Sequence, residues 1–150
     1  MKTQRLNILY THSSAGLFGS DKSLFYILNY LDKERFRPLV VLPGKGPLVE
    51  KLKNAGIHVI FPPCMGIIRR FRGPAGMALY FFKLAMEIVW LIVLLKKNKI
   101  SLVHVNTTSI LGGMIAARVC GIPSVCHVRE IRVSPKWIGK LLATMVNVFS

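Results

Sequence analysis

Residues 6–31 read LNILYTHSSAGLFGSDKSLFYILNYL, which contains a strand, a loop and a helix in that order. The run from Leu6 to Tyr10 is apolar on both faces, as is typical of a buried parallel strand. Small residues follow through Ser20, and apolar residues then recur with the spacing of one helix face at Leu24, Ile27, Leu28 and Leu31. We expect Ser20 to cap this helix, so that its free N–H groups point at the loop. A glycine-bearing loop before a helix N-terminus favours an anion site, and a phosphate is the expected anion.

The rest of the chain continues the alternation of strands and helices. Further strands are expected at 37–42, 57–61, 102–106 and 123–128. Helices are expected at 48–54, 74–98, 109–120 and from 134 onward. Strands separated by helices imply right-handed crossovers and a mostly parallel sheet. The sequence therefore predicts a single α/β domain over residues 1–150, a doubly wound Rossmann-like sheet with strand order 3-2-1-4-5.

Three loops are expected at the carboxyl edge of this sheet, where doubly wound folds bind their ligands. They are residues 12–20, 106–108 and 127–130. In the predicted order the first and fourth strands are neighbours, so the first two loops form the walls of one crevice. His127 closes the fifth strand, and we expect it to face the crevice. The alternative is a partly buried histidine that bonds to the backbone.

The charge balance of the chain is strongly basic. Among 150 residues there are 21 Lys and Arg against six Asp and Glu, a net charge of +15, and 52% of the residues are apolar. Such a charge predicts a polyanionic partner: nucleic acid, anionic lipid or a phosphorylated substrate. The basic residues do not cluster on one helix and no zinc-finger spacing occurs, so nucleic acid is not the expected partner.

Two of the basic groups flank the longest apolar stretch, residues 75–95. They are Arg69-Arg70-Arg72 and Lys96-Lys97-Lys99. This arrangement favours peripheral attachment to an anionic membrane surface, and a solvated basic surface is the alternative. A transmembrane helix is disfavoured because Lys83 and Glu87, near the middle, would each cost about 2.5–3.5 kcal/mol. We expect these two side chains to form a narrow polar stripe on an otherwise buried helix.

The chain lacks several familiar chemical motifs. Gly16 and Gly19 do not complete G-x-G-x-x-G, and no acid closes the second strand, which disfavours dinucleotide binding; simple turn geometry is the alternative role of these glycines. There is no phosphate-binding P-loop, nucleophile elbow or H-E-x-x-H. Three cysteines without a C-x-x-C pair predict neither a disulfide framework nor a metal site. They fit a reducing compartment, and we expect a cytoplasmic protein whose chain begins without a signal peptide.

Three stretches together resemble the N-terminal domain of retaining GT-B glycosyltransferases of the family 4 type. They are residues 16–21 (GLFGSD), 102–107 (LVHVNT) and 123–130 (PSVCHVRE). The similarity extends from about Leu6 to Ser134. In that family the loop usually reads Gly-Gly-x-Glu, whereas here it reads Phe-Gly-Ser-Asp.

The resemblance implies a hexosyltransferase-type enzyme that moves a sugar from a nucleotide-sugar to a glycan or lipid-linked acceptor, as in polysaccharide biosynthesis. It implies no obligatory metal and no cofactor beyond the nucleotide-sugar co-substrate. His127 would line the transfer site. The residues implied to bind donor phosphate or acceptor are Gly16, Gly19, Ser20, Asn106, Thr107, Arg129 and Glu130.

The resemblance also implies a second, C-terminal Rossmann-like domain that binds the nucleotide and carries an acidic E-x7-E element. Residues 1–150 do not contain it, so we expect an acceptor-side half that is inactive alone. The alternatives are a non-catalytic Rossmann-like module that binds anions or membranes, and one subunit of a split transferase.

Overall fold

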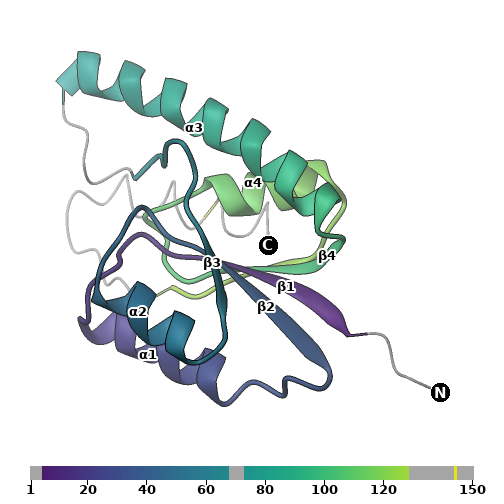
Figure 1. Cartoon of the computed structure of the whole chain (residues 1–150). Helices are drawn as coiled ribbons and strands as arrows, with labels where there is room; N and C mark the ends of the chain where they lie inside the picture. The colour runs from purple at the N-terminus through teal and green to yellow at the C-terminus, as the bar shows by residue number, and fades with distance from the viewer. Residues whose placement is uncertain (1–4, 68–72, 129–143, 145–150) are drawn as a thin grey trace.

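The computed structural model describes residues 5–67, 73–128 and 144, and a parallel sheet of five strands forms its centre (Figure 1). The strands are β1 (Leu6–Thr11), β2 (Phe36–Val41), β3 (His58–Ile60), β4 (Ile100–Val105) and β5 (Ser124–Cys126). Their order is β3-β2-β1-β4-β5, and every neighbouring pair is parallel. The predicted doubly wound fold and strand order are confirmed.

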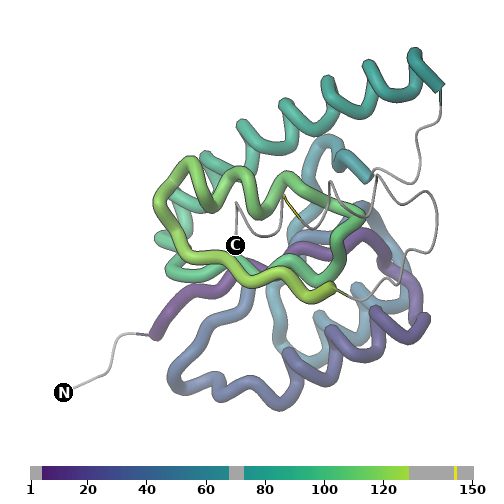
Figure 2. Tube along the Cα trace, turned by 180° about the vertical axis from the view of Figure 1, so that it is seen from behind, coloured from purple at the N-terminus to yellow at the C-terminus, as the bar shows by residue number. Residues whose placement is uncertain are grey.

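Two layers of helices enclose the sheet. The helices are α1 (Gly19–Asn29), α2 (Pro47–Asn54), α3 (Gly73–Lys97) and α4 (Gly112–Val119). Helices α1 and α2 cover one face, and α3 and α4 cover the other, as both views show (Figures 1 and 2). The winding changes direction at β1, so the switch point of the sheet lies between β1 and β4.

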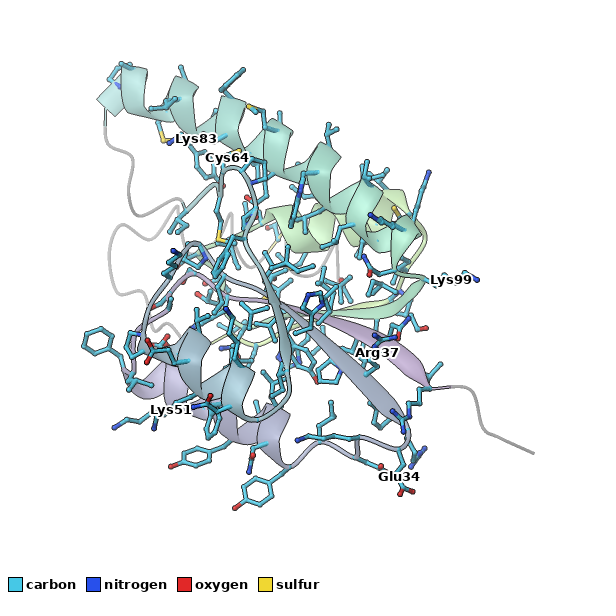
Figure 3. All side chains as sticks on the ribbon, viewed as in Figure 1. Glu34, Arg37, Lys51, Cys64, Lys83 and Lys99 are labelled. Atoms are coloured by element: carbon cyan, nitrogen blue, oxygen red, sulfur yellow. The ribbon has the colours of Figure 1, made fainter. Side chains whose placement is uncertain are left out.

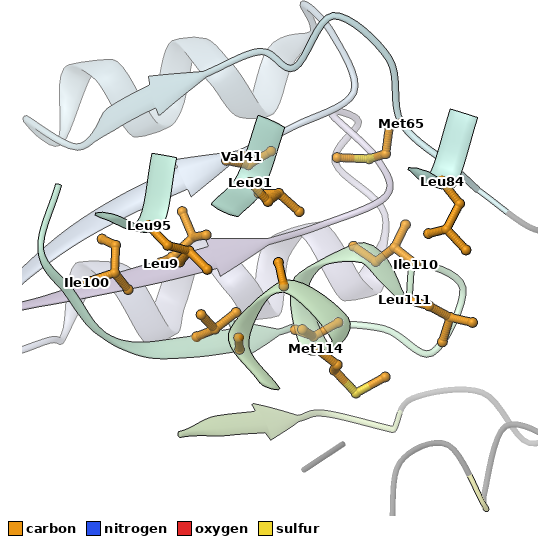
Figure 4. Close-up of a cluster of buried hydrophobic side chains, with 14 of the residues drawn as sticks. Leu9, Val41, Met65, Leu84, Leu91, Leu95, Ile100, Ile110, Leu111 and Met114 are labelled. Carbon is orange, nitrogen blue, oxygen red and sulfur yellow. The ribbon is translucent and has the colours of Figure 1, made fainter. Parts of the chain in front are cut away.

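Each face of the sheet has its own hydrophobic core, because the strands alternate their side chains between the two layers. On β1, Ile8 and Tyr10 face α1 and α2, where Leu24 and Leu28 are buried. Leu9 faces the other way, into the larger cluster beneath α3 and α4 (Figure 4). Burial on both faces explains why the strand sequences read as continuous apolar runs.

Helix α4 approaches the sheet closely because it begins with two glycines. A Cβ at Gly113 would lie 3.0 Å from Thr11 Oγ1 and 3.0 Å from Val105 Cγ2. The expected helix start at Ser109 is wrong: α4 begins three residues later, at Gly112. The residues between form a turn, in which the Ser109 N–H donates to Thr107 Oγ1 at 3.1 Å. The helix expected from 134 onward lies outside the described residues.

The long helix α3 is not an otherwise buried helix, so that expectation is wrong. Only 28% of its most apolar window is buried, although its length and composition would allow it to cross a membrane. Its buried residues lie on one stripe: Tyr80, Leu84, Glu87, Leu91 and Leu95. The predicted polar stripe is also wrong, because Glu87 is buried at the centre of that stripe while Lys83 lies half-buried at its border.

Candidate functional site

The loops that follow β1 and β4 meet at the carboxyl edge of the sheet, at the switch point. The Asn106 N–H donates to the Thr11 carbonyl at 3.0 Å, and the His12 N–H donates to the Val41 carbonyl at 3.1 Å. These bonds extend the pairing of β1 with β4, and of β1 with β2, by one residue beyond the ends of the strands. The predicted crevice walls are therefore neighbours, and they are joined at their base.

A chain of buried polar side chains connects these walls. His12 Nε2 lies 2.6 Å from Asp21 Oδ1, and His12 Nδ1 lies 3.2 Å from Asn106 Nδ2. An amide nitrogen only donates, so His12 accepts at Nδ1 and carries its proton at Nε2, which donates to Asp21. All three residues are buried. The loop after β1, the first turn of α1 and the loop after β4 are thus held as one unit.

Asp21, and not Ser20, caps helix α1. The helix begins at Gly19 after the N-cap residue Phe18, so Ser20 is its second residue. The Phe18 N–H donates to Asp21 Oδ2 at 2.8 Å, and the Ser14 hydroxyl donates to the same oxygen at 3.4 Å. A carboxylate interacts favourably with a helix N-terminus. The first turn of α1 therefore already contains an anion, the chain's own, where the sequence predicted a phosphate.

An open hollow of about 360 Å³ lies beside this cap, between the loops after β1 and β2. Its lining comes from residues 13–16 and 43–47, and Lys45 contributes an exposed cation. Gly46 lets the two loops touch, since a Cβ there would lie 2.3 Å from the Ala15 carbonyl oxygen. The Leu48 N–H donates to that same oxygen at 3.1 Å. This hollow is the solvent-accessible part of the site.

The structure brings several of the predicted binding residues to this edge. The Gly16 N–H donates to Ser14 Oγ at 3.2 Å, and Gly16 lines the hollow. Gly19 begins α1 with open space around it. The Ser20 carbonyl accepts from Asn106 Nδ2 at 3.4 Å. Asn106 and Thr107 are buried, so their side chains hold the loops in place and do not face solvent.

His127 lies just beyond β5 and is exposed. It belongs to a row of ring side chains that also contains His104 and Tyr10. Its N–H donates to the Val105 carbonyl at 2.8 Å, which continues the pairing of β4 and β5. Its ring centre lies 6.1 Å from that of His104, which in turn stacks on Tyr10 at 5.0 Å. These rings lie on neighbouring strands, on the face that α1 and α2 cover. Arg129 and Glu130 lie outside the described residues.

A second buried carboxylate, Glu87, was missed as a candidate. Its Oε2 accepts from the Gly66 N–H at 2.7 Å, and a Cβ at Gly112 would lie 2.7 Å from Glu87 Cδ. Burial raises the pKa of Glu87 to about 7, and the hydrogen bond from Gly66 opposes this shift. Burial and, to a lesser degree, the Glu87 charge raise the pKa of Tyr80 to about 12. Glu87 thereby connects α3 to α4 and to the segment around Gly66.

The sequence did contain signals for both missed acids. Asp21 precedes Leu24 and Leu28 by three and seven residues, so it lies on the buried face of α1. Glu87 follows Leu84 by three residues and precedes Leu91 by four, so it lies on the buried stripe of α3. Within the described residues, no group of three or more His, Cys, Asp or Glu side chains is placed to hold a metal ion.

A separate hollow of about 270 Å³ lies at the opposite edge of the sheet, where the strands begin. Its lining includes Asn7, Arg37, Lys97 and Lys99, two of which are labelled in Figure 3. Ligands of doubly wound sheets bind at the carboxyl ends of the strands. We therefore assign the site to the carboxyl edge.

Solved structures of larger proteins share this fold. HepE from Anabaena, in complex with UDP, matches with a TM-score of 0.69 and 20% identity, over 97% of this chain and 36% of HepE. A UDP-GlcNAc 2-epimerase from Neisseria meningitidis, bound to UDP-GlcNAc, matches with a TM-score of 0.63 and 16% identity, over 97% and 39% of the two chains. A glycosyltransferase from Rickettsia africae matches with a TM-score of 0.62 and 16% identity, over 93% and 35%.

These similarities show that the chain has a GT-B-like, Rossmann-type fold. The chain spans between 35% and 39% of the length of these three proteins. No protein-family model matches the sequence, and no curated protein matches it either.

Proposed function

We propose that this chain is the acceptor-side domain of a nucleotide-sugar-dependent glycosyltransferase of the retaining, family 4 type. The observation that carries this proposal is the open hollow at the carboxyl edge of the sheet, beside the loops that hydrogen bonds join after β1 and β4, because doubly wound proteins bind their ligands at this edge. HepE, which shares the fold, was solved with UDP and with UDP-glucose. The resemblance of residues 16–21 and 123–130 to the family supports the same assignment.

We assign the open hollow to the donor diphosphate or the acceptor. Ser14 and Gly16 supply polar groups at its wall, and the ammonium of Lys45 would stabilise negative charge that develops on a leaving phosphate. His127, exposed beyond β5, is assigned to the transfer site, with Arg129 and Glu130 beside it in the sequence. Asn106, Thr107 and Ser20 act as positioning residues, because their hydrogen bonds join the loops to each other and to the start of α1.

The remaining parts of the enzyme belong to other components. We propose that a second Rossmann-like domain or subunit binds the nucleotide and supplies the acidic E-x7-E element. The match to only 36% of HepE supports this division. The acceptor that we propose is a glycan or a lipid-linked glycan of polysaccharide biosynthesis, in the cytoplasm. Alone, residues 1–150 are expected to bind nucleotide-sugars weakly and to transfer no sugar.

A nucleotide-sugar epimerase is the second candidate, because two UDP-GlcNAc 2-epimerases share the fold at a TM-score of 0.63. The reaction products separate the two enzymes. A transferase releases UDP and lengthens an acceptor, whereas a 2-epimerase inverts one sugar carbon and needs no acceptor. A non-catalytic anion-binding module would do neither.

Amide chemical shifts of the isotope-labelled chain, titrated with UDP-glucose, test the site. We expect shifts to concentrate at Ser14, Gly16 and Lys45, with an affinity weaker than micromolar. Glucose serves as the uncharged control ligand. Shifts confined to the opposite hollow, around Arg37 and Lys99, or no shift at millimolar UDP-glucose, would contradict the assignment.

The role of His127 is tested in the enzyme completed by its donor-binding domain. The substitution His127→Ala should lower kcat by about 10²–10³, the cost of losing one hydrogen bond made mainly in the transition state. The melting temperature should stay unchanged, because the side chain is exposed. The exposed His58, on the opposite edge, provides the control variant His58→Ala. Earlier melting of His127→Ala with full activity per folded molecule would make His127 structural.

A further inference from the structure

The side of α3 that points away from the sheet is apolar and exposed. We define the outer face of α3 as Phe82, Met86, Val89 and Val93, which recur with helical spacing along one side. Phe82 is 63% exposed and Val89 is 64% exposed. Helix α3 runs along the top of the molecule, in one layer with α4 (Figure 1).

Such a face is unusual for a helix in contact with water. A surface helix normally has charged or polar residues opposite its buried stripe. Here the buried stripe that includes Leu84 and Leu91 packs toward the sheet and α4, yet the opposite side is also apolar. The only acidic residue of α3, Glu87, is buried. The outer face therefore has the composition of a surface that something apolar covers.

The charges near this face indicate what covers it. Lys96 and Lys97 lie in the last turn of α3, Lys99 lies two residues beyond its end, and all three side chains are exposed. The chain as a whole carries a net charge of +15. An apolar helix face with lysines at its end matches an anionic bilayer, which offers hydrocarbon beside negative head groups.

We propose that the outer face of α3 lies in the surface layer of an anionic membrane, with Lys96 and Lys97 on the lipid head groups. The helix lies along the membrane and does not cross it. Crossing would remove the buried stripe from the sheet and expose Glu87 and Lys83 to hydrocarbon. The proposal rests on α3 and its charges, so it stands or fails separately from the proposed enzymatic role.

Co-sedimentation of the full chain with vesicles tests this proposal. We expect binding to vesicles of mixed phosphatidylglycerol and phosphatidylcholine, weak binding to phosphatidylcholine alone, and loss of binding at high salt. The substitution Val89→Glu should weaken binding at least about tenfold, because it places a charge in the apolar layer. Val119→Glu is the matched control, since Val119 is 65% exposed on α4.

A pair of double variants tests the lysines. Lys96→Gln with Lys97→Gln should weaken binding about 30-fold, at about 1 kcal/mol for each lysine. Lys51→Gln with Lys53→Gln removes the same charge from α2, on the other face of the sheet, and should leave binding nearly unchanged.

Four results would overturn the proposal. They are no binding to either vesicle, equal binding to both, equal effects of the test and control variants, and a dimer that Val89→Glu dissociates without any vesicle binding. The last result would assign the face to a second copy of the chain. Release from cell membranes by detergent only, and never by alkaline wash, would instead indicate a spanning helix.

Discussion

Among the residues that the structure describes, two acidic side chains are buried, one on each face of the sheet, and they are stabilised very differently. Asp21, at the start of α1, lies against His12, Ser14 and the Phe18 N–H. Glu87, in the middle of α3, accepts one hydrogen bond from Gly66 at Oε2, and its Oε1 has no hydrogen-bond partner. A carboxylate with a full set of partners can support a loop structure, whereas one with a single partner favours protonation.

The largest loss of stability is expected for substitution of Asp21, which has more hydrogen-bond partners than Glu87. Asp21→Ala removes the charged acceptor of two donors, His12 Nε2–H and the Phe18 N–H, and at about 1.5–3 kcal/mol for each bond it should lower the free energy of unfolding by about 3–5 kcal/mol. Urea denaturation at pH 7 measures this loss. The control is Asp32→Ala: the exposed Asp32 also accepts two N–H groups, from Glu34 and Arg35, and should cost about 1 kcal/mol. Equal losses would show that the buried contacts of Asp21 add nothing.

Substitution of Glu87 should have the opposite effect and stabilise the chain at high pH. Its pKa rises from 4.5 to about 7 on folding, so the folded state binds the proton more tightly than the unfolded state. The resulting stabilisation is complete below pH 4.5, and it is lost as the pH rises through 7. Above pH 8, Glu87→Gln should therefore be more stable than the native chain by up to about 3 kcal/mol, and at pH 4.5 by little.

Urea denaturation of Glu87→Gln at several pH values checks this sign. Glu50→Gln provides the control, because Glu50 is exposed on α2 and its substitution should give no such pH dependence. A Glu87→Gln chain that is less stable than the native one at every pH would mean that the carboxylate, and not the protonated acid, stabilises the fold.

A smaller loss of stability is expected for substitution of Gly46, which contacts the loop between β1 and Asp21. Gly46→Ala would place a Cβ 2.3 Å from the Ala15 carbonyl oxygen, so the loops after β1 and β2 must separate. We expect a cost of about 1–3 kcal/mol in the free energy of unfolding and weaker nucleotide-sugar binding at the hollow. Gly44→Ala is the matched control, because a Cβ there meets nothing within 4 Å. Similar losses in the two variants would refute the close contact.

The smallest expected effect is on the reactivity of Cys64. Burial and the Glu87 charge both raise the pKa of the Cys64 thiol, and Lys83 lowers it. Glu87→Gln should therefore speed alkylation of Cys64 at pH 8.5 by about two- to threefold, because more of the thiol is ionised. Cys120 provides the reference within the same molecule, and its rate should not change. An unchanged rate at Cys64 would place the Glu87 charge too far away to act.

The sheet could be predicted from the sequence because it depends on local patterns. Apolar runs such as 6–10, separated by helical spacing, determine the strand number, the parallel pairing and the order, and the structure confirms all three. The helix expected at 48–54 is also confirmed, as α2, which begins one residue earlier, at Pro47. These features depend on neighbours within one strand or helix.

The site depended on distant partners and was predicted only in part. The loops at Gly16 and Asn106 were expected to meet, and they do, through His12, which is 94 residues from Asn106. Neither the contact of His12 with Asn106 nor the cap at Asp21, in place of Ser20, was predicted. The expected polar stripe of Lys83 and Glu87 was wrong because a spacing of four residues in a helix places two side chains on roughly one side but does not decide which of them is buried.

The hydrogen bonds between Asn106 and the loop after β1 have a consequence for the entropy of binding. A loop that must become ordered around a ligand loses conformational entropy, which lowers the affinity. Here the Asn106 N–H bonds to Thr11, and its amide bonds to His12 and to the carbonyl of Ser20, before any ligand arrives. The loop after β1, which lines the hollow, is therefore preorganised, and a ligand that binds there has little disorder to remove.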